Sequence, residues 1–153
     1  MKNQILVVDS GLGGLNVLRL LQKSMPHRNF IYFADEAYCP YGEKSTECVK
    51  TRVVKIVDVF KHVTCATVLA CNTASVCAGD ELRQAYAPLF DVVLPTAYAV
   101  KQSGAKRVAV LATKLTVQSG VYESLLAKCG VDVTSVDCGE FVGLVESNAP
   151  AGQ

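Results

Sequence analysis

The chain has 153 residues, of which 15 are Lys or Arg and 14 are Asp or Glu, and its formal net charge is +1. Hydrophobic residues make up 50% of it, a share that excludes a disordered chain, and the length suits one domain with a core of its own. The charges are nearly balanced and no block of Lys and Arg occurs, so the sequence does not indicate binding to nucleic acid or to an anionic membrane surface. No apolar run approaches the ~18 residues of a membrane helix.

Apolar, β-branched runs alternate with helix-like stretches along the chain. Strands are predicted over residues 4–9, 30–35, 66–71, 92–95, 107–113 and 131–138. These runs are nearly continuous in apolar residues, which is typical of parallel strands covered on both faces. Apolar residues at helical spacing predict helices over residues 15–22, 46–62, 74–86 and 116–128. The alternation predicts an α/β fold, a single domain over residues 1–146 with a parallel sheet and helices on both faces, followed by a tail or linker over residues 147–153.

The seven cysteines indicate a reducing compartment. Their number is odd, no Cys-x-x-Cys pair occurs, and the segment before the first strand is too short for a secretory signal. We therefore expect a cytoplasmic protein without a disulfide scaffold. The two histidines, His27 and His62, lie near no cysteine cluster, so we expect no metal site.

A glycine-rich turn follows the first predicted strand, where an open parallel sheet collects functional residues. Gly11 and Gly13 fit part of a dinucleotide-binding pattern, and Asp35 ends the second strand where a ribose-binding acid would lie. However, Asn16 replaces the third glycine of that pattern, and the charge of Asp9 would repel a pyrophosphate. Asp9 at the end of a buried strand is either an N-cap for the next helix or a functional carboxylate.

Cys71 differs from the other cysteines because it lies between a predicted strand and the start of a helix. The partial positive charge of a helix N-terminus predicts a lowered pKa for this thiol, and hence a thiolate that acts as base or nucleophile. Asn72 and Thr73 follow directly and offer hydrogen bonds to a small polar ligand. The alternative is that Cys71, like most cysteines, is a small buried hydrophobic residue.

Four motifs in register resemble those of the glutamate racemase family, within the aspartate/glutamate racemase superfamily. They are Asp-Ser-Gly-x-Gly-Gly at 9–14, Cys-Pro-Tyr-Gly-x-Lys-Ser at 39–45, Ala-Cys-Asn-Thr-Ala-Ser at 70–75, and Ala-Thr-x-x-Thr-x-x-Ser-x-x-Tyr at 112–122. The resemblance extends to about Glu146 and implies the racemase α/β fold. It also implies cofactor-independent interconversion of L- and D-glutamate for peptidoglycan synthesis, by two cysteine thiols on opposite faces of the α-carbon.

By the same resemblance, Cys71 is one of the two catalytic thiols and Asp9 is the carboxylate that assists it. The other matched residues would bind the carboxylates and ammonium group of glutamate: Ser10, Tyr41, Gly42, Asn72, Thr73, Thr113 and Thr116. Charge builds on the substrate carboxylate as the α-proton leaves, and N–H and hydroxyl donors without metal ligands suit the stabilisation of such charge.

The family's second domain carries a Gly-Cys-Thr-His motif, and no cysteine of this chain is followed by Thr-His. The segment 138–146 resembles the family's Cys-Pro-x-Phe-Val-Pro-Leu-Val-Glu but has glycine at both proline positions, which predicts a looser hinge. We therefore expect the first domain only, with the second racemase domain absent. The chain would then be half of an enzyme, a homo-oligomer of half-sites, or a glutamate-binding or regulatory remnant, with aspartate as an alternative substrate. An exposed interdomain face would favour self-association.

Overall fold

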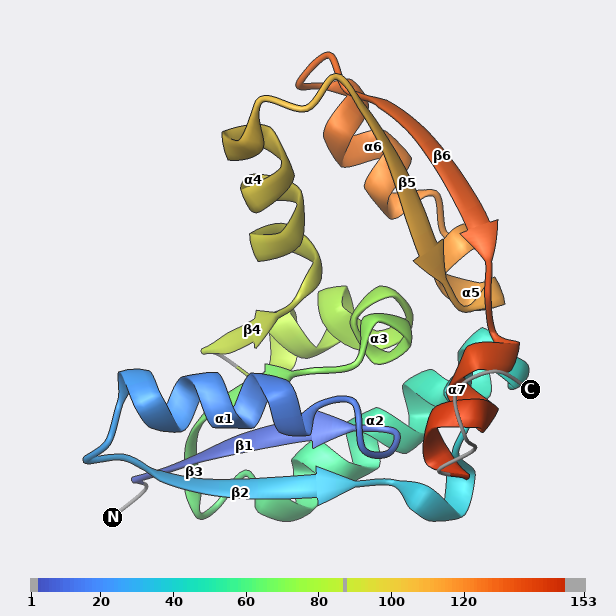
Figure 1. The fold of residues 1–153 in the computed structure, drawn as a ribbon. Coiled ribbons are helices and arrows are strands. Elements are labelled where there is room, and N and C mark those ends of the chain that lie inside the picture. The colour runs from blue at the N-terminus through green and yellow to red at the C-terminus, as the bar shows by residue number, and fades with distance from the viewer. Residues whose placement is uncertain (1–2, 87, 148–153) are drawn as a thin grey trace.

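The computed structural model describes residues 3–86 and 88–147. Strands and helices alternate, and all strand pairs of the described residues are parallel, which confirms the α/β class (Figure 1). The first sheet has the order β2-β1-β3-β4. Its strands are β1 (Gln4–Asp9), β2 (Asn29–Ala34), β3 (Thr64–Leu69) and β4 (Leu89–Asp91).

Helices cover both faces of this first sheet. α1 (Leu15–Ser24) packs on the face that carries Ile5 and Val7. α2 (Thr46–Phe60) and α3 (Asn72–Ala85) pack on the opposite face, against Leu6 and Val8. Because successive residues of β1 point to opposite faces, a continuous apolar run is what such a central strand requires.

The last two strands form a separate sheet, whereas one sheet was expected. β5 (Arg107–Ala112) pairs with β6 (Asp132–Asp137), and α4 (Val93–Ser103) connects the end of β4 to this pair (Figure 1). We call residues 93–137 the second body and the first sheet with its helices the first body. α4 and α6 (Val121–Ala127) cover one face of the pair. On the other face Leu111 is 63% exposed, so within the described residues this sheet has helices on one face only.

Three predicted elements differ from the structure. Residues 93–95 begin α4 and Val92 is its N-cap residue, so the strand predicted over 92–95 does not form. The Asp91 carboxylate accepts hydrogen bonds from the first helical N–H groups, Val93 N at 2.8 Å and Leu94 N at 3.1 Å. The helix predicted over 116–128 is divided into α5 (Lys114–Gln118) and α6, since Gly120 takes a φ of 62° between them. The hinge-like segment forms a helix, α7 (Glu140–Glu146).

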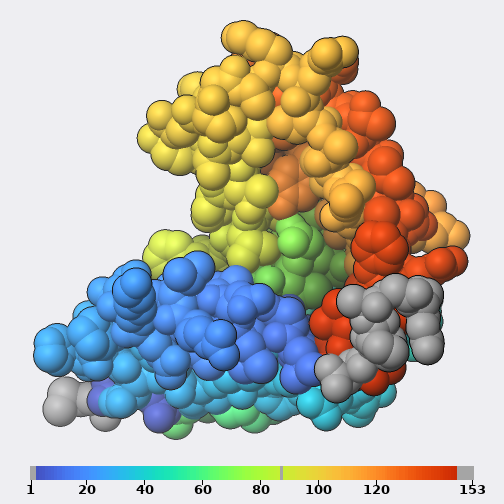
Figure 2. Space-filling model, in the orientation of Figure 1, coloured from blue at the N-terminus to red at the C-terminus, as the bar shows by residue number. Residues whose placement is uncertain are grey.

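The remaining elements are two short 3-10 helices after β2, η1 (Glu36–Tyr38) and η2 (Tyr41–Glu43). The tail predicted over 147–153 lies outside the described residues except for Ser147. None of the described helices is long and apolar enough to cross a membrane. In the space-filling view, the body that carries α4, β5 and β6 stands over the first sheet, and α7 (red) lies against the blue part of the chain that holds the turn after β1 (Figure 2).

Candidate active site

The ends of the neighbouring strands β1 and β3 bring Asp9, Ser10 and Cys71 together. Asp9 is buried, and its Oδ2 accepts a hydrogen bond from Gly11 N at 3.0 Å, which shapes the turn after β1. The Ser10 Oγ lies 3.8 Å from the Cys71 Sγ. Gly14 packs so closely on this corner that a Cβ there would lie 2.7 Å from the Asp9 Cβ. The turn therefore needs glycine for close packing around the carboxylate.

Cys71 is the N-cap of α3, and its Sγ accepts a hydrogen bond from Ala74 N at 3.4 Å. Burial and the negative charge of Asp9 raise the pKa of the Cys71 thiol, and they outweigh the hydrogen bonds from Ala74, Ser10 and Thr73, which favour the thiolate. The lowered pKa expected from the helix N-terminus alone is therefore wrong.

η2 brings Tyr41 and Gly42 to the site. The Tyr41 side chain is buried, and its hydroxyl donates a hydrogen bond to Asp35 Oδ2 at 2.7 Å. Arg52 donates two more hydrogen bonds to the Asp35 carboxylate, each at 2.8 Å, and stacks on the ring of Tyr38. Burial alone would raise the pKa of Asp35, but the bonds from Arg52 and Tyr41 hold it below its usual value. The Tyr41 hydroxyl is therefore already engaged within the protein.

A chain of threonine hydroxyls joins the two bodies at the site. The Thr73 Oγ1 at the start of α3 lies 2.8 Å from the Thr113 Oγ1 at the end of β5, which lies 3.2 Å from the Thr116 Oγ1 in α5. Gly42 packs directly on Thr113, because a Cβ at position 42 would lie 2.7 Å from the Thr113 Cβ. Residues of η2 and α3 thus meet at Thr113, which follows β5 and is the N-cap of α5.

The predicted site residues surround one cavity of about 580 Å³. Its lining includes all of them: Asp9, Ser10, Tyr41, Gly42, Cys71, Asn72, Thr73, Thr113 and Thr116. The structure therefore brings the predicted residues together, while their individual roles stay predictions. Sequence reasoning missed the remaining wall, which includes Thr96 of α4, Cys138 and Glu146. The motif at 138–146 contained a signal for part of it, but no helix was expected there.

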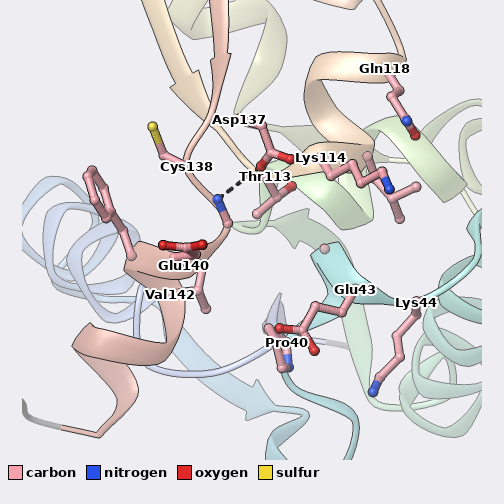
Figure 3. A pocket seen from close by; sticks show the side chains of 14 residues that line it. Pro40, Glu43, Lys44, Thr113, Lys114, Gln118, Asp137, Cys138, Glu140 and Val142 are labelled. Atoms are coloured by element: carbon pink, nitrogen blue, oxygen red, sulfur yellow. Dashed lines mark hydrogen bonds between the residues drawn. The ribbon is translucent and has the colours of Figure 1, made fainter.

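A second cavity of about 820 Å³ adjoins the first and shares Gly42, Thr113 and Cys138 with it. Figure 3 shows Glu43 and Lys44 on one side of it and Lys114 and Asp137 on the other. Asp137 Oδ1 accepts a hydrogen bond from Gly139 N at 3.0 Å, the dashed line in Figure 3. Within residues 3–86 and 88–147, no three His, Cys, Asp or Glu side chains are grouped as metal ligands.

Comparison with known proteins identifies the chain's relatives. The model of the Asp/Glu/Hydantoin racemase family matches residues 15–150. The glutamate racemase of Trichormus variabilis is 42% identical over 147 residues, which are 93% of this chain and 50% of that protein. The glutamate racemase of Streptococcus equi subsp. equi is 40% identical over 148 residues, 92% of this chain and 55% of that protein.

Solved structures of glutamate racemases also superpose on nearly the whole of this chain. The glutamate racemase from Francisella tularensis in complex with D-glutamate superposes with a TM-score of 0.90 at 32% identity, over 99% of this chain and 59% of that one. The glutamate racemase from Campylobacter jejuni gives a TM-score of 0.89 at 32% identity, over 98% of this chain and 62% of that one. The chain spans about half the length of the curated relatives it matches. It belongs to the Asp/Glu/Hydantoin racemase family, and within that family it is similar to glutamate racemases.

Proposed function

We propose that this chain carries one half of a cofactor-independent glutamate racemase site, with Cys71 as the thiol that serves one face of the α-carbon. The observation that supports this most is the common cavity, which the Cys71 thiol, the Asp9 carboxylate and the hydroxyl and amide groups of the other predicted residues all line. The relatives named glutamate racemase point to the same substrate. Such an enzyme would supply D-glutamate for peptidoglycan in the cytoplasm.

In the proposed reaction, the Cys71 thiolate takes the α-proton and becomes a thiol, while the electron pair of the broken C–H bond spreads into the α-carboxylate. Asp9 raises the pKa of that thiol, so the thiolate, once formed, is a stronger base toward a weakly acidic carbon. A substrate ammonium group next to Asp9 would offset the carboxylate charge and favour the thiolate only when substrate is bound. Ser10, Asn72 and Thr73 would donate hydrogen bonds to the carboxylates.

Racemisation also needs a thiol on the opposite face. Because the chain spans about half of its relatives, we assign that thiol to a complementary domain or chain. Cys138 also lines the cavity, from the second body, and is the internal alternative. A half-site of this kind would exchange the α-proton from one face without inverting the centre. Aspartate in place of glutamate is the alternative substrate.

The test is incubation of the purified chain with L-glutamate in deuterated water. Proton NMR measures loss of the α-proton signal, and circular dichroism measures inversion. We expect slow exchange without inversion, abolished in Cys71→Ala and unchanged in Cys129→Ala, whose cysteine is exposed and outside the cavity lining. L-Aspartate under the same conditions tests the substrate.

The outcomes separate the alternatives. Glutamate binding by calorimetry with no exchange would contradict the catalytic half-site and favour a glutamate-binding or regulatory remnant. Full inversion by the chain alone would contradict the need for an external thiol. Loss of that inversion in Cys138→Ala would then identify Cys138 as the second base, and a dependence on protein concentration would indicate a homo-oligomer.

A further inference from the structure

Tyr122 connects the second body to the candidate site through one short hydrogen bond. It lies on α6, is 5% exposed, and its hydroxyl donates to the Asn72 Oδ1 at 2.6 Å. Asn72 is the first residue of α3, follows Cys71 directly and lines the cavity. Tyr122 itself does not line the cavity, so its hydroxyl reaches the site only through the Asn72 amide.

This bond decides which end of the Asn72 amide remains for a ligand. A side-chain amide has one acceptor oxygen and two N–H donors. Since the tyrosine hydroxyl already donates to the oxygen, the free hydrogen-bonding groups are the donors of Nδ2. Burial raises the pKa of Tyr122, so its hydroxyl keeps the proton that it donates throughout the neutral range. An amide held in this way suits an anionic oxygen and not an ammonium group.

We infer that Tyr122 is a positioning residue that orients the Asn72 amide to donate to a substrate carboxylate. The inference rests on the proposed function for the identity of the ligand, but the orientation itself does not depend on a ligand. It also gives the link between the two bodies a role in recognition, because α6 must stay docked on α3 for the amide to stay oriented. Tyr122 acts through Asn72 and has no direct part in proton transfer.

The first measurement is free of ligand. The Asn72 side-chain amide is observed by ¹⁵N NMR and assigned by its loss in Asn72→Asp. In the unaltered chain we expect it to be as rigid as the backbone of α3. In Tyr122→Phe, which removes only the hydroxyl, it should become as mobile as the exposed Asn16 amide. The matched control is Tyr98→Phe, because that tyrosine is 63% exposed and lies outside the cavity lining.

The second measurement is calorimetry with L-glutamate. We expect Tyr122→Phe to weaken binding about tenfold, as for the loss of one ordering hydrogen bond, with Tyr98→Phe unchanged. Asn72→Asp keeps an acceptor for Tyr122 but replaces the donor by a negative charge, so it should weaken binding at least a hundredfold. Thermal unfolding of each variant shows whether it is folded.

The two measurements separate this inference from the proposed function. If the unaltered chain binds no glutamate, the proposed function fails, and the NMR result still decides the orientation. An Asn72 amide that stays rigid in Tyr122→Phe would overturn the inference, whatever the affinity. Equal weakening in Tyr98→Phe, or undiminished binding in Asn72→Asp, would overturn it as well.

Discussion

The Glu146 Oε1 accepts a hydrogen bond from the backbone N–H of Leu12 at 2.9 Å, although 134 positions separate the two residues. This bond ties the end of α7 to the glycine turn that follows β1, directly beside Ser10. α7 contains no fully buried residue, so it has little apolar packing of its own to hold it there. A single polar contact thus helps to fix one wall of the cavity.

We expect Glu146→Ala to release α7. The Leu12 amide should exchange with deuterium about five- to tenfold faster, as for the loss of one hydrogen bond, and the α7 amides should follow, while global unfolding changes little. Hydrogen exchange with mass spectrometry measures this. Glu146→Gln retains an acceptor oxygen and serves as control. Unchanged exchange in Glu146→Ala would mean that other contacts hold the helix.

The reactivity of Cys71 should depend on Asp9. Because burial and the Asp9 charge raise the thiol pKa, alkylation by iodoacetamide should be slow at pH 7 and become faster as the pH rises and more thiolate forms. Asp9→Asn removes the negative charge, which lowers that pKa and should speed alkylation at pH 8. Mass spectrometry resolves the site, with the exposed Cys129 as internal control. A slower reaction in Asp9→Asn would contradict this electrostatic account.

The buried Asp35 carboxylate makes stability depend on pH. Its pKa is lower in the folded chain than in the unfolded one, so its contribution is present above about pH 4 and is lost as pH falls through the folded pKa. Arg52→Met should therefore lower the free energy of unfolding by about 2 kcal/mol at pH 7, and this difference should shrink below pH 4. Urea denaturation at several pH values measures both effects.

Lys50→Met is the matched control, because the Lys50–Glu81 pair lies at the surface and should leave stability unchanged. A deficit in Arg52→Met that stayed constant down to pH 2 would argue for lost packing on Tyr38 and against the carboxylate.

Two glycines of the site should respond differently to a methyl group. Gly42→Ala would force the methyl against the Thr113 Cβ, which belongs to a backbone-anchored side chain. We expect it to cost about 1–3 kcal/mol of stability and to separate η2 from β5. In Gly11→Ala the methyl meets only the flexible end of Glu146, which can swing away. Thermal unfolding should therefore show a larger loss for Gly42→Ala, and equal losses would contradict the packing account.

Local apolar patterns were sufficient to predict most of the strands. β1 matches its predicted range, and the strands near residues 30, 66 and 107 begin or end within two residues of theirs. The short run at 92–95 fails because four apolar residues suit a strand or a helix equally, and the Asp91 cap that decides between them is a contact rather than a pattern.

Motif register was sufficient to predict which residues line the cavity, because three of the four motifs lie at the carboxyl ends of parallel strands and the fourth, at 39–45, follows β2 after η1. The pKa of Cys71 was predicted in the wrong direction, since helix position was considered without burial or the neighbouring Asp9. The α7 wall was missed because two glycines suggested a loose segment, whereas the bond from Leu12 to Glu146 depends on the three-dimensional fold.

The Thr73–Thr113 and Tyr122–Asn72 hydrogen bonds join the two bodies near the candidate site, and the turn between α4 and β5 lies far from the first sheet (Figure 1). If the second body rotated about these contacts, it would move as a lever with its fulcrum beside the candidate site. A rotation about the fulcrum displaces each atom in proportion to its distance from it. The turn between α4 and β5 therefore moves far for a small angle, while the atoms around Cys71 hardly shift. Rocking of the second body would therefore change the spacing of the cavity walls least around Cys71. That is where the proposed chemistry needs a constant spacing.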